Sequence, residues 1–272
     1  MKTTQFLPAT LVAIGFLTAS AAWGQLPTPT AYYPFEEGVG NMTADASPTM
    51  GPMGTLTGGW APGHIGDFSI DLNGANNRVN IPTNAFAGAA TTNDTISFSF
   101  WANQQGDIAN SSSFWAVSPT AGGNQRGAQA HAPWGNGTIF WDTAGCCGGN
   151  TRLQNNPGSL ADNEWHHFAF VKDGANKSIY VDGAQIVASG GASPLLPFSE
   201  LLIGAEPPST NSFNGLIDDF AVFDVALTQE NISDIFNGTP IIAAVPEPTS
   251  VAIWSLMAAG LAGFGYYRIR RR

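Results

Sequence analysis

The sequence has few charged residues, and basic residues are especially scarce. Charged side chains make up 11% of the 272 residues, and only ten of them are Lys or Arg. Residues 25–237 hold five basic residues against nineteen acidic ones, which is a net charge of −14. Nucleic-acid-binding proteins need basic side chains to contact phosphates, so this balance excludes that class of partner. The same balance suits a bound hard cation such as Ca²⁺.

Sequence motifs of catalysis are also missing. Glycoside hydrolases need two suitably spaced carboxylates, and the E-x-D-x-E arrangement of one group of glycanases does not occur. The chain has no G-x-S-x-G nucleophile motif, no H-E-x-x-H metal motif and no phosphate-binding glycine loop. Asp142 and Glu164 stand alone. We therefore predict no catalytic residue and a protein that is not an enzyme.

The first 24 residues have the pattern of a signal peptide. Lys2 precedes an apolar run from residue 6 to residue 22, and the small residue Gly24 follows it. This order predicts cleavage after Gly24, which leaves Gln25 as the first residue of the exported protein. The alternative is an uncleaved anchor helix, which Pro8 and the short apolar run disfavour.

Residues 245–272 have the pattern of a sorting signal that contains a transmembrane helix. Residues 251–267 are apolar and, at about 1.5 Å per residue, span about 25 Å as a helix, which is enough for a bilayer core. Basic residues after a membrane helix stay in the cytoplasm, which places the preceding domain outside. These basic residues are Arg268, Arg270, Arg271 and Arg272.

The motif Pro246-Glu247-Pro248, followed by this helix and the arginines, resembles the PEP-CTERM sorting signal. The resemblance implies processing by an exosortase in a Gram-negative bacterium that makes extracellular polysaccharide. It implies delivery to the cell surface or extracellular matrix, with the membrane helix as an anchor at least until it is removed. A plain tail anchor is the alternative.

The middle of the chain predicts three consecutive strands that form a meander. The first segment is apolar or aromatic without proline, and turn residues at 173–176 and at Asp182-Gly183 separate the segments. The predicted strands are residues 165–171, 178–181 and 185–188.

Two motifs of this meander, W-H-H-F-A-F-V-K-D-G and I-Y-V-D-G, resemble the signature of the laminin-G-like, concanavalin A-like lectin/glucanase superfamily. D-T-I-S-F-S-F-W-A at residues 94–102 and G-L-I-D-D-F-A-V-F-D-V-A-L-T at residues 215–228 are similar to further family motifs in the same order. The resemblance covers about residues 30–237 and implies an all-β fold, a two-sheet antiparallel jelly-roll sandwich. We expect one domain at residues 25–237 and a linker at residues 238–244.

Other segments carry secondary-structure signals of their own. Residues 95–101 alternate between apolar side chains on one face and mainly polar side chains on the other. Residues 69–74 and 77–82 predict a hairpin across a Gly-Ala-Asn turn. Thr228 is the expected N-cap of a short helix at residues 229–236.

Acidic residues near the two ends of the domain predict a structural calcium ion. Calcium takes several oxygen ligands from carboxylates and loop carbonyls. Four acids fall where the first and last strands should join: Asp218, Asp45, Glu36 and Asp219. Neighbouring strand residues face opposite sides, so Asp218 and Asp219 can both bind the ion only across a bulge, and Asp218 is the favoured ligand. The alternative is that these acids are exposed or accept hydrogen bonds from loop amides.

The only two cysteines, Cys146 and Cys147, are adjacent. An exported protein favours oxidation, and the glycines around the pair give the backbone the freedom that a vicinal disulfide requires. Two free thiols and an intermolecular bridge are the alternatives. No spacing of cysteines with histidines suits zinc. Related modules carry a similar C-C-G element, and the resemblance supports the disulfide.

Aromatic residues just before the cysteine pair predict a carbohydrate-binding surface. Trp134, His131 and Trp141 lie close together in the sequence and could offer ring faces to a sugar. Tryptophans in β-sandwiches are more often core residues, which is the alternative. His166 and His167 are neighbours on a strand, so we expect their rings on opposite sides and no shared metal.

Together these features predict an exported, non-catalytic binding or adhesion module, stabilised by calcium, with a polysaccharide or glycoprotein as its ligand. One alternative is a purely structural matrix protein that acts as a spacer or associates with itself. The other is a weak glycoside hydrolase.

Overall fold

The computed structural model describes residues 25–82, 92–106, 111–158, 160, 162–207 and 211–242. The predicted signal peptide and the predicted sorting signal, with its membrane helix, lie outside these residues. Within the described ranges, no helix has the length and hydropathy needed to cross a bilayer.

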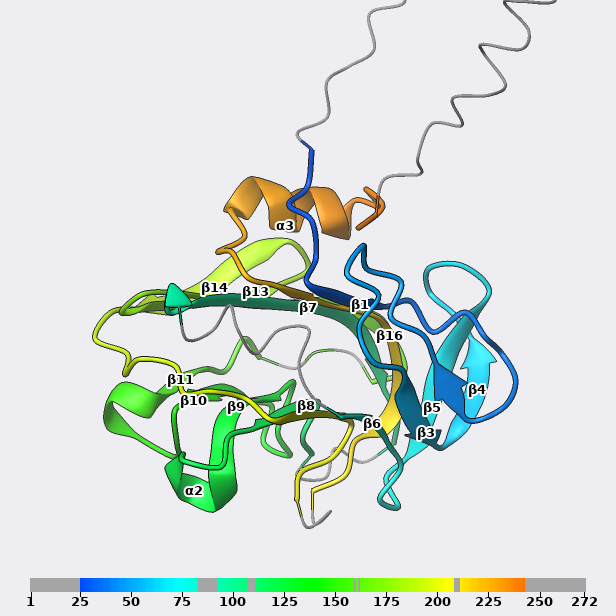
Figure 1. The fold of residues 1–272 in the computed structure, drawn as a ribbon, viewed down its shortest axis with the longest axis horizontal. Helices are drawn as coiled ribbons and strands as arrows, with labels where there is room; N and C mark the ends of the chain where they lie inside the picture. Colours follow the sequence, from blue (N-terminus) through cyan, green and yellow to red (C-terminus); the bar gives the residue numbers. More distant parts are fainter. Residues whose placement is uncertain are drawn as a thin grey trace, which may run out of the picture.

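The described residues form two antiparallel sheets that face each other as a sandwich (Figure 1). Sheet A contains, in spatial order, β14 (Ala184–Ser189), β13 (Asn176–Val181), β12 (Trp165–Asp173), β7 (Thr95–Gln104), β16 (Asn214–Phe223), β5 (Phe68–Asn73) and β4 (Gly59–Pro62), and β1 (Ala31–Tyr33) also pairs with β16. Sheet B contains, in spatial order, β11 (Arg152–Asn155), β10 (Ile139–Thr143), β9 (Arg126–His131), β8 (Phe114–Val117), β15 (Glu200–Ile203), β6 (Arg78–Pro82), β3 (Gly54–Thr57) and β2 (Met42–Thr43). The described residues also form three short helices: α2 (Gly122–Gln125), η1 (Gly149–Thr151) and α3 (Gln229–Phe236). This is the predicted two-sheet jelly-roll sandwich.

Strand β7 lies in the middle of sheet A and shows why the sandwich has one continuous core. Phe98 and Phe100 point inward and are fully buried, and the Phe98 ring centroid lies 4.3 Å from that of Phe114 in sheet B. Trp101 lies on the opposite face, where its ring stacks on Phe236 of α3. The alternation predicted for residues 95–101 is therefore confirmed.

The predicted meander is also confirmed. Strands β12, β13 and β14 pair antiparallel in sequence order. Asp182 and Gly183 have positive φ angles of 50° and 77°, which the two-residue turn between β13 and β14 requires.

Helix α3 begins at the predicted N-cap. The side chain of Thr228 accepts a hydrogen bond from the Asn231 amide, and the side chain of Asn231 accepts one from the Thr228 amide. Ile232 and Ile235 pack on the outer face of sheet A, in a cluster that also contains Leu26 near one end of the described chain. The other described end, at Ile241 and Ile242, joins the same cluster.

The predicted hairpin of residues 69–74 and 77–82 is wrong. β5 pairs with β16 and β4 in sheet A, whereas β6 pairs with β15 and β3 in sheet B. The intervening turn carries the chain across the sandwich instead of back along the same sheet. Both strands turn apolar side chains to the shared core, so their alternation is the same as that of a hairpin.

Candidate ligand-binding site

The candidate site is built on three strands at one end of sheet B, namely β9, β10 and β11. Small apolar residues of β9, Ala128 and Ala130, face the core, and Gln129 and His131 face outward. Sequence analysis did not predict β9 or β11, because their short segments contain few of the β-branched and aromatic residues that mark a strand.

Asp142 on β10 is the centre of an ion cluster on this outer face. Its carboxylate is completely buried and accepts hydrogen bonds from two guanidinium groups. Arg152 binds it through Nε and Nη2 at 2.6 Å each, and Arg126 binds it through Nη1 at 2.6 Å. Burial lowers the pKa of Arg126, and the nearby Asp142 carboxylate acts against that shift.

The guanidinium groups of this cluster also pack on aromatic rings. Arg126 lies 4.6 Å from the ring centroid of Trp115, which is buried on the outer face of sheet B. Arg152 lies 4.4 Å from the ring centroid of Phe140. Each contact is a cation–π arrangement, so the rings help to fix the orientation of both arginines.

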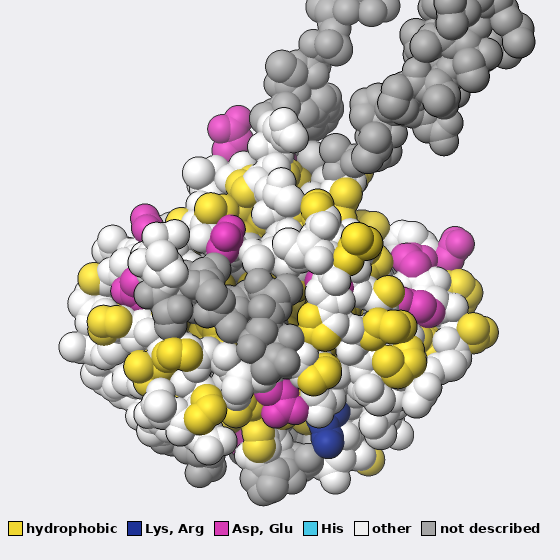
Figure 2. Space-filling model, viewed as in Figure 1, with side chains coloured by type: hydrophobic (Ala, Val, Ile, Leu, Met, Phe, Trp, Pro, Cys, Tyr) yellow, Lys and Arg dark blue, Asp and Glu magenta, His cyan; other side chains and the backbone are white. Residues whose placement is uncertain are grey.

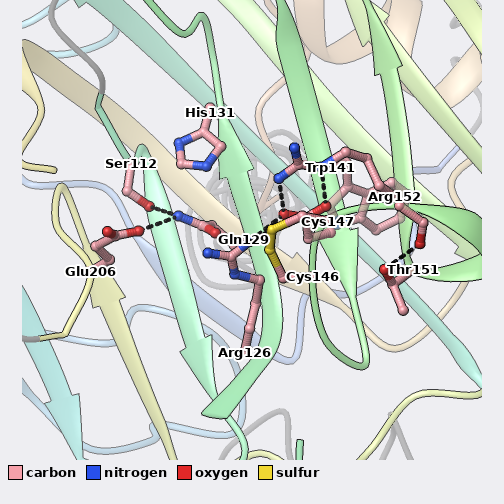
Figure 3. A network of polar contacts seen from close by, with 12 residues as sticks. Ser112, Arg126, Gln129, His131, Trp141, Cys146, Cys147, Thr151, Arg152 and Glu206 are labelled. Carbon is pink, nitrogen blue, oxygen red and sulfur yellow. Dashed lines mark hydrogen bonds and ion pairs between the residues drawn. A yellow bond between two sulfur atoms is a disulfide. The ribbon is translucent and has the colours of Figure 1, made fainter. Parts of the chain in front are cut away.

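Cys146 and Cys147 form the predicted vicinal disulfide beside the ion cluster. The Nη1 atom of Arg126 lies 3.4 Å from the Cys147 sulfur, so the bridge covers one side of the guanidinium (Figure 3). Among the described residues, Asp142 and the two cysteines are the one group of three potential ligands whose atoms lie within 4.8 Å of one another. Two guanidinium groups on Asp142 and the oxidised sulfurs make this group unsuitable for a cation.

A second polar network extends from β9 away from the ion cluster. The side-chain nitrogen of Gln129 donates to Ser112 at 2.8 Å and to Glu206 at 2.9 Å. The Nδ1 atom of His131 pairs with the carbonyl of Ser111. Burial lowers the pKa of His131 to about 4, so the ring is neutral at physiological pH.

The aromatic residues expected to bind sugar occupy different environments. Trp134 is half-buried and meets His131 edge-on, with ring centroids 4.3 Å apart. Trp141 is completely buried in the core, so its ring face is not available to a ligand and that part of the prediction is corrected. Phe140, which the sequence analysis missed, is half-buried and lies 6.3 Å from Trp134 in an edge-to-face arrangement.

The loop that carries Trp134 also lines an open cleft of about 430 Å³. Both apolar and polar groups line this cleft: Pro133, Asn136, Gly137, Asn156, Leu160 and Asp162. A smaller cavity between the sheets shares Pro133, Leu160 and Asp162 with it. Gln104 lines that cavity, and among the described residues its buried Oε1 has no hydrogen-bond donor. The cleft therefore offers amide and carboxylate groups beside apolar surface, a combination that suits a sugar.

Two of the four acids predicted to bind calcium, Asp218 and Asp219, lie on the last strand, β16. Glu36 follows β1 and Asp45 follows β2. β1 pairs with β16, as expected. Asp45 accepts hydrogen bonds from the amides of Tyr32, Ser47 and Gly51. Asp218 accepts hydrogen bonds from the amides of His64, Ile65 and Asp219. Glu36 accepts them from Asp67 and Phe68, and Asp219 accepts one from the Tyr32 hydroxyl.

The bulge that Asp218 and Asp219 would need is present in β16. The register shifts between Asp218 and Ala221, and Asp219 has a φ of 50°. Burial raises the pKa of Asp218 to about 7 and that of Asp219 to about 6, and Glu36 adds to the shift of Asp219. Among the described residues, no three of the predicted acids bring ligand atoms within 4.8 Å of one another. The calcium site stays a prediction.

The two adjacent histidines lie on opposite faces of β12. His167 is fully buried and its Nε2 pairs with the Ser99 hydroxyl at 2.9 Å. The Nδ1 atom of His166 pairs with Asp182 at 2.8 Å. The expected separation of the two rings is confirmed.

Comparison with known proteins identifies a family and a shared fold. A family model described as the concanavalin A-like lectin/glucanases superfamily matches residues 73–233. No curated protein sequence matches the chain significantly. Among solved structures, domain 4 of AbnA, an extracellular arabinanase from Geobacillus stearothermophilus, was determined in complex with arabinotriose. It has a TM-score of 0.58 at 19% identity, and the match covers 78% of this chain and 99% of that one.

Two botulinum neurotoxin structures share the fold as well. The receptor-binding domain of mosaic serotype C/D has a TM-score of 0.58 at 14% identity, covering 78% of this chain and 51% of that one. The binding domain of neurotoxin DC in complex with SialylT has a TM-score of 0.55 at 15% identity, covering 79% and 52%. The match therefore spans about half the length of the neurotoxin chains. At these identities, the likeness establishes the fold alone.

Proposed function

The chain belongs to the concanavalin A-like lectin/glucanases superfamily, and on that basis we propose that it is a non-catalytic carbohydrate-binding protein of the cell surface or extracellular matrix. The observation that carries this proposal is the open cleft of about 430 Å³ beside the half-buried Trp134. Arabinotriose in the AbnA domain and SialylT in the neurotoxin domain are ligands of proteins with the same fold, which supports the choice of ligand class.

The cleft has the chemistry that sugar recognition requires. Asn136 and Asn156 can donate and accept hydrogen bonds, and Asp162 is an exposed acceptor. Leu160 and Pro133 supply apolar surface for the C–H face of a sugar ring. Because the Trp134 loop lines one side of the cleft, a bound chain would also come close to an aromatic side chain.

A glycan array, followed by calorimetry on the best ligand, tests this proposal. We expect Asp162→Ala to weaken binding about tenfold or more, because a hydrogen bond to a charged group contributes about 1.5–3 kcal/mol. Asp224→Ala is the matched control, since Asp224 is an equally exposed aspartate next to β16. A wild-type protein that binds no glycan would contradict the proposal, and concentration-dependent self-association in that case would favour the structural matrix protein.

The absence of catalysis is also part of the proposal. A glycoside hydrolase requires an acid and a second carboxylate on opposite sides of the scissile bond. Of the described residues that line the cleft, Asp162 is the only carboxylate. We expect no release of reducing sugar from a polysaccharide that the protein binds, and measurable release would restore the hydrolase alternative.

We also propose that a structural Ca²⁺ binds at the acids of the first and last strands. The raised pKa values of Asp218 and Asp219 mean that their charged forms lack full compensation, which a divalent cation would supply. Asp219 and Glu36 each keep one oxygen without a donor among the described residues. Both oxygens of Asp218 already accept amide hydrogen bonds, so Asp219 and Glu36 replace Asp218 as the favoured ligands. The ion would supply charge compensation and cross-link the first strand to the last.

Thermal unfolding in Ca²⁺ and after EDTA treatment tests the calcium site. Ca²⁺ at about one hundred times its Kd stabilises a folded protein by about 2.7 kcal/mol. We expect Ca²⁺ to raise the melting temperature and Asp219→Asn to abolish that rise. Equal melting temperatures of the wild type in Ca²⁺ and in EDTA would eliminate the site.

Export and sorting complete the proposal. We propose that residues 1–24 are removed as a signal peptide and that an exosortase processes residues 245–272. Fractionation of cells, with mass spectrometry of both ends of the recovered protein, tests each step. Full-length protein with an intact leader in the cytosol would contradict it.

A further inference from the structure

Basic residues of this acidic domain are gathered in one place. Residues 25–237 contain five lysines and arginines. Arg126 and Arg152 bind the carboxylate of Asp142, and Lys177 lies close enough for that carboxylate to influence its pKa. Acidic side chains predominate elsewhere in the domain, and Figure 2 shows them spread over the visible face. The domain as a whole is acidic, so this concentration of positive charge is confined to one region.

Lys177 is the unusual member of this group. It lies on β13, points between the two sheets and is only 3% exposed. Its Nζ donates to the carbonyls of Trp141 at 2.8 Å and Thr151 at 3.0 Å, and lies 4.7 Å from the Trp141 ring centroid. Among the described residues, no carboxylate lies within ion-pair distance of it. The buried ammonium group therefore has hydrogen-bond acceptors but no adjacent counter-ion.

A small cavity, which we call the basic pocket, opens beside Lys177. It lies where the edge strand β11 of sheet B contacts β13 and β14 of sheet A. Both Lys177 and Arg152 line it, together with polar and glycine residues: Gly149, Asn150, Ser189 and Gly190. Its volume is about 20 Å³. A water molecule needs roughly 10–15 Å³ by this measure, so the pocket admits a group of one or two oxygen atoms and excludes a sugar ring.

We propose that the basic pocket binds the carboxylate of an acidic sugar, so that the ligand of this protein is a polysaccharide that contains uronic acid. The inference rests on the proposed carbohydrate-binding function and narrows it to one class of sugar. A carboxylate fits the volume of the pocket and would supply the counter-ion that Lys177 lacks. Arg152, which also lines the pocket, adds a second positive charge nearby.

The basic pocket and the cleft lie along the same edge strand, β11. β11 begins at Arg152 in the basic pocket, and Asn156, which lines the cleft, follows its last residue. At about 3.3 Å per residue, these two sites lie roughly 13 Å apart along one edge strand. One polysaccharide chain can therefore place a carboxylate in the pocket while its neighbouring sugars occupy the cleft.

The acidic residues elsewhere on the domain do not prevent such binding. At physiological ionic strength the Debye length is about 8 Å, so exposed carboxylates farther away are largely screened. Lys177 and Arg152 lie in the pocket wall, where solvent screens them much less.

Selective ¹³C labelling of lysine tests the proposal in the unmodified sequence. The chain has three lysines, of which Lys2 lies in the predicted signal peptide. Lys172 is the internal control, because it is equally buried but paired with Asp94. We expect oligogalacturonate to shift the Lys177 signal and raise the pH at which it titrates, while Lys172 stays constant and a neutral galacto-oligosaccharide of equal length moves neither.

The groups that face Lys177 determine its titration in this experiment. Burial lowers the pKa of Lys177 to about 7, the positive charges of Lys172 and Arg152 add to the shift, and Asp142 opposes it. A carboxylate bound in the pocket would favour the charged amine. An equal response to sodium acetate at the same carboxylate concentration would overturn the assignment to a sugar, and no response of Lys177 to oligogalacturonate would overturn the site itself.

Binding measurements with a variant separate this inference from the function on which it rests. We expect Lys177→Met to lose about tenfold or more in affinity for oligogalacturonate and to keep its affinity for any neutral glycan, whereas Arg78→Met on β6 changes neither. Arg152→Gln replaces Lys177→Met if the latter melts before the assay temperature. A wild type that binds neutral and acidic oligosaccharides equally well overturns the inference alone, and one that binds neither overturns both proposals.

Discussion

Replacement of Asp142 by asparagine should strongly destabilise the protein. Asp142 is fully buried and accepts three hydrogen bonds of 2.6 Å from two guanidinium groups. Removal of one partner from a buried ion pair costs about 3–5 kcal/mol, because the remaining charge is left uncompensated. Asparagine keeps one acceptor oxygen, so we expect the lower end of that range, about 3 kcal/mol.

Urea and thermal unfolding measure this loss directly. For a domain of roughly 220 residues, about 3 kcal/mol corresponds to a fall of about 10 °C in melting temperature. Asp162→Asn is the control, because an exposed carboxylate without such partners should change stability by less than about 0.5 kcal/mol.

A triple variant distinguishes lost charge compensation from lost packing. Asp142→Asn combined with Arg126→Met and Arg152→Met removes all three charges, and we expect it to recover most of the stability that the single variant loses. A loss below about 1 kcal/mol in the single variant, or no recovery in the triple variant, would refute the conclusion that Asp142 holds this face together by charge.

Three further predictions concern the core, the cysteine pair and pH. Phe98→Ala should cost about 3–5 kcal/mol in urea unfolding, because it empties a fully buried site next to Phe114, and a loss below about 1 kcal/mol would contradict the described core. Intact mass should show the exported protein two hydrogens lighter before reduction than after it, and equal masses would rule out the Cys146–Cys147 bridge. The folded state lowers the pKa of Lys177 to about 7, so it favours the neutral amine; the free energy of unfolding should rise from about pH 7 towards pH 10, and Lys177→Met should flatten that rise. An identical slope in the variant would assign the rise to other groups.

The sequence predicts an element well where the element's own residues determine its conformation and its buried face. Residues 95–101 alternate between large apolar and polar side chains, and the structure places Phe98 and Phe100 in the core accordingly. Thr228 and Asn231 cap α3 through contacts three residues apart, so the start of that helix is encoded locally.

Pairing between distant strands is not encoded in this way. β5 and β6 have the same alternation as a hairpin, yet each pairs within a different sheet, because long-range partners such as β16 and β15 decide the layer. The candidate site depends on the same kind of information. Ala128 and Ala130 of β9 give almost no strand signal, and their place is fixed by the β8 and β10 strands on either side.

The chemistry of the site was only partly predictable for the same reason. The vicinal disulfide was one of three states open to the two adjacent cysteines, and the family resemblance favoured it. The ion cluster, in contrast, joins Arg126, Asp142 and Arg152 from three different strands. The prediction that Trp141 binds a sugar was wrong. Its proximity to Trp134 in the sequence does not show that, at its position on β10, its side chain faces the core.

Leu26 and Ile241, near the two described ends of the domain, belong to one apolar cluster on the outer face of sheet A. Both ends lie beside α3 (Figure 1). The candidate site on β9 to β11 belongs to the other sheet. A host protein could therefore accept this domain as an insertion in a single surface loop, because the polypeptide enters and leaves at the same spot. In such a host, the candidate site on sheet B would face away from the point of insertion.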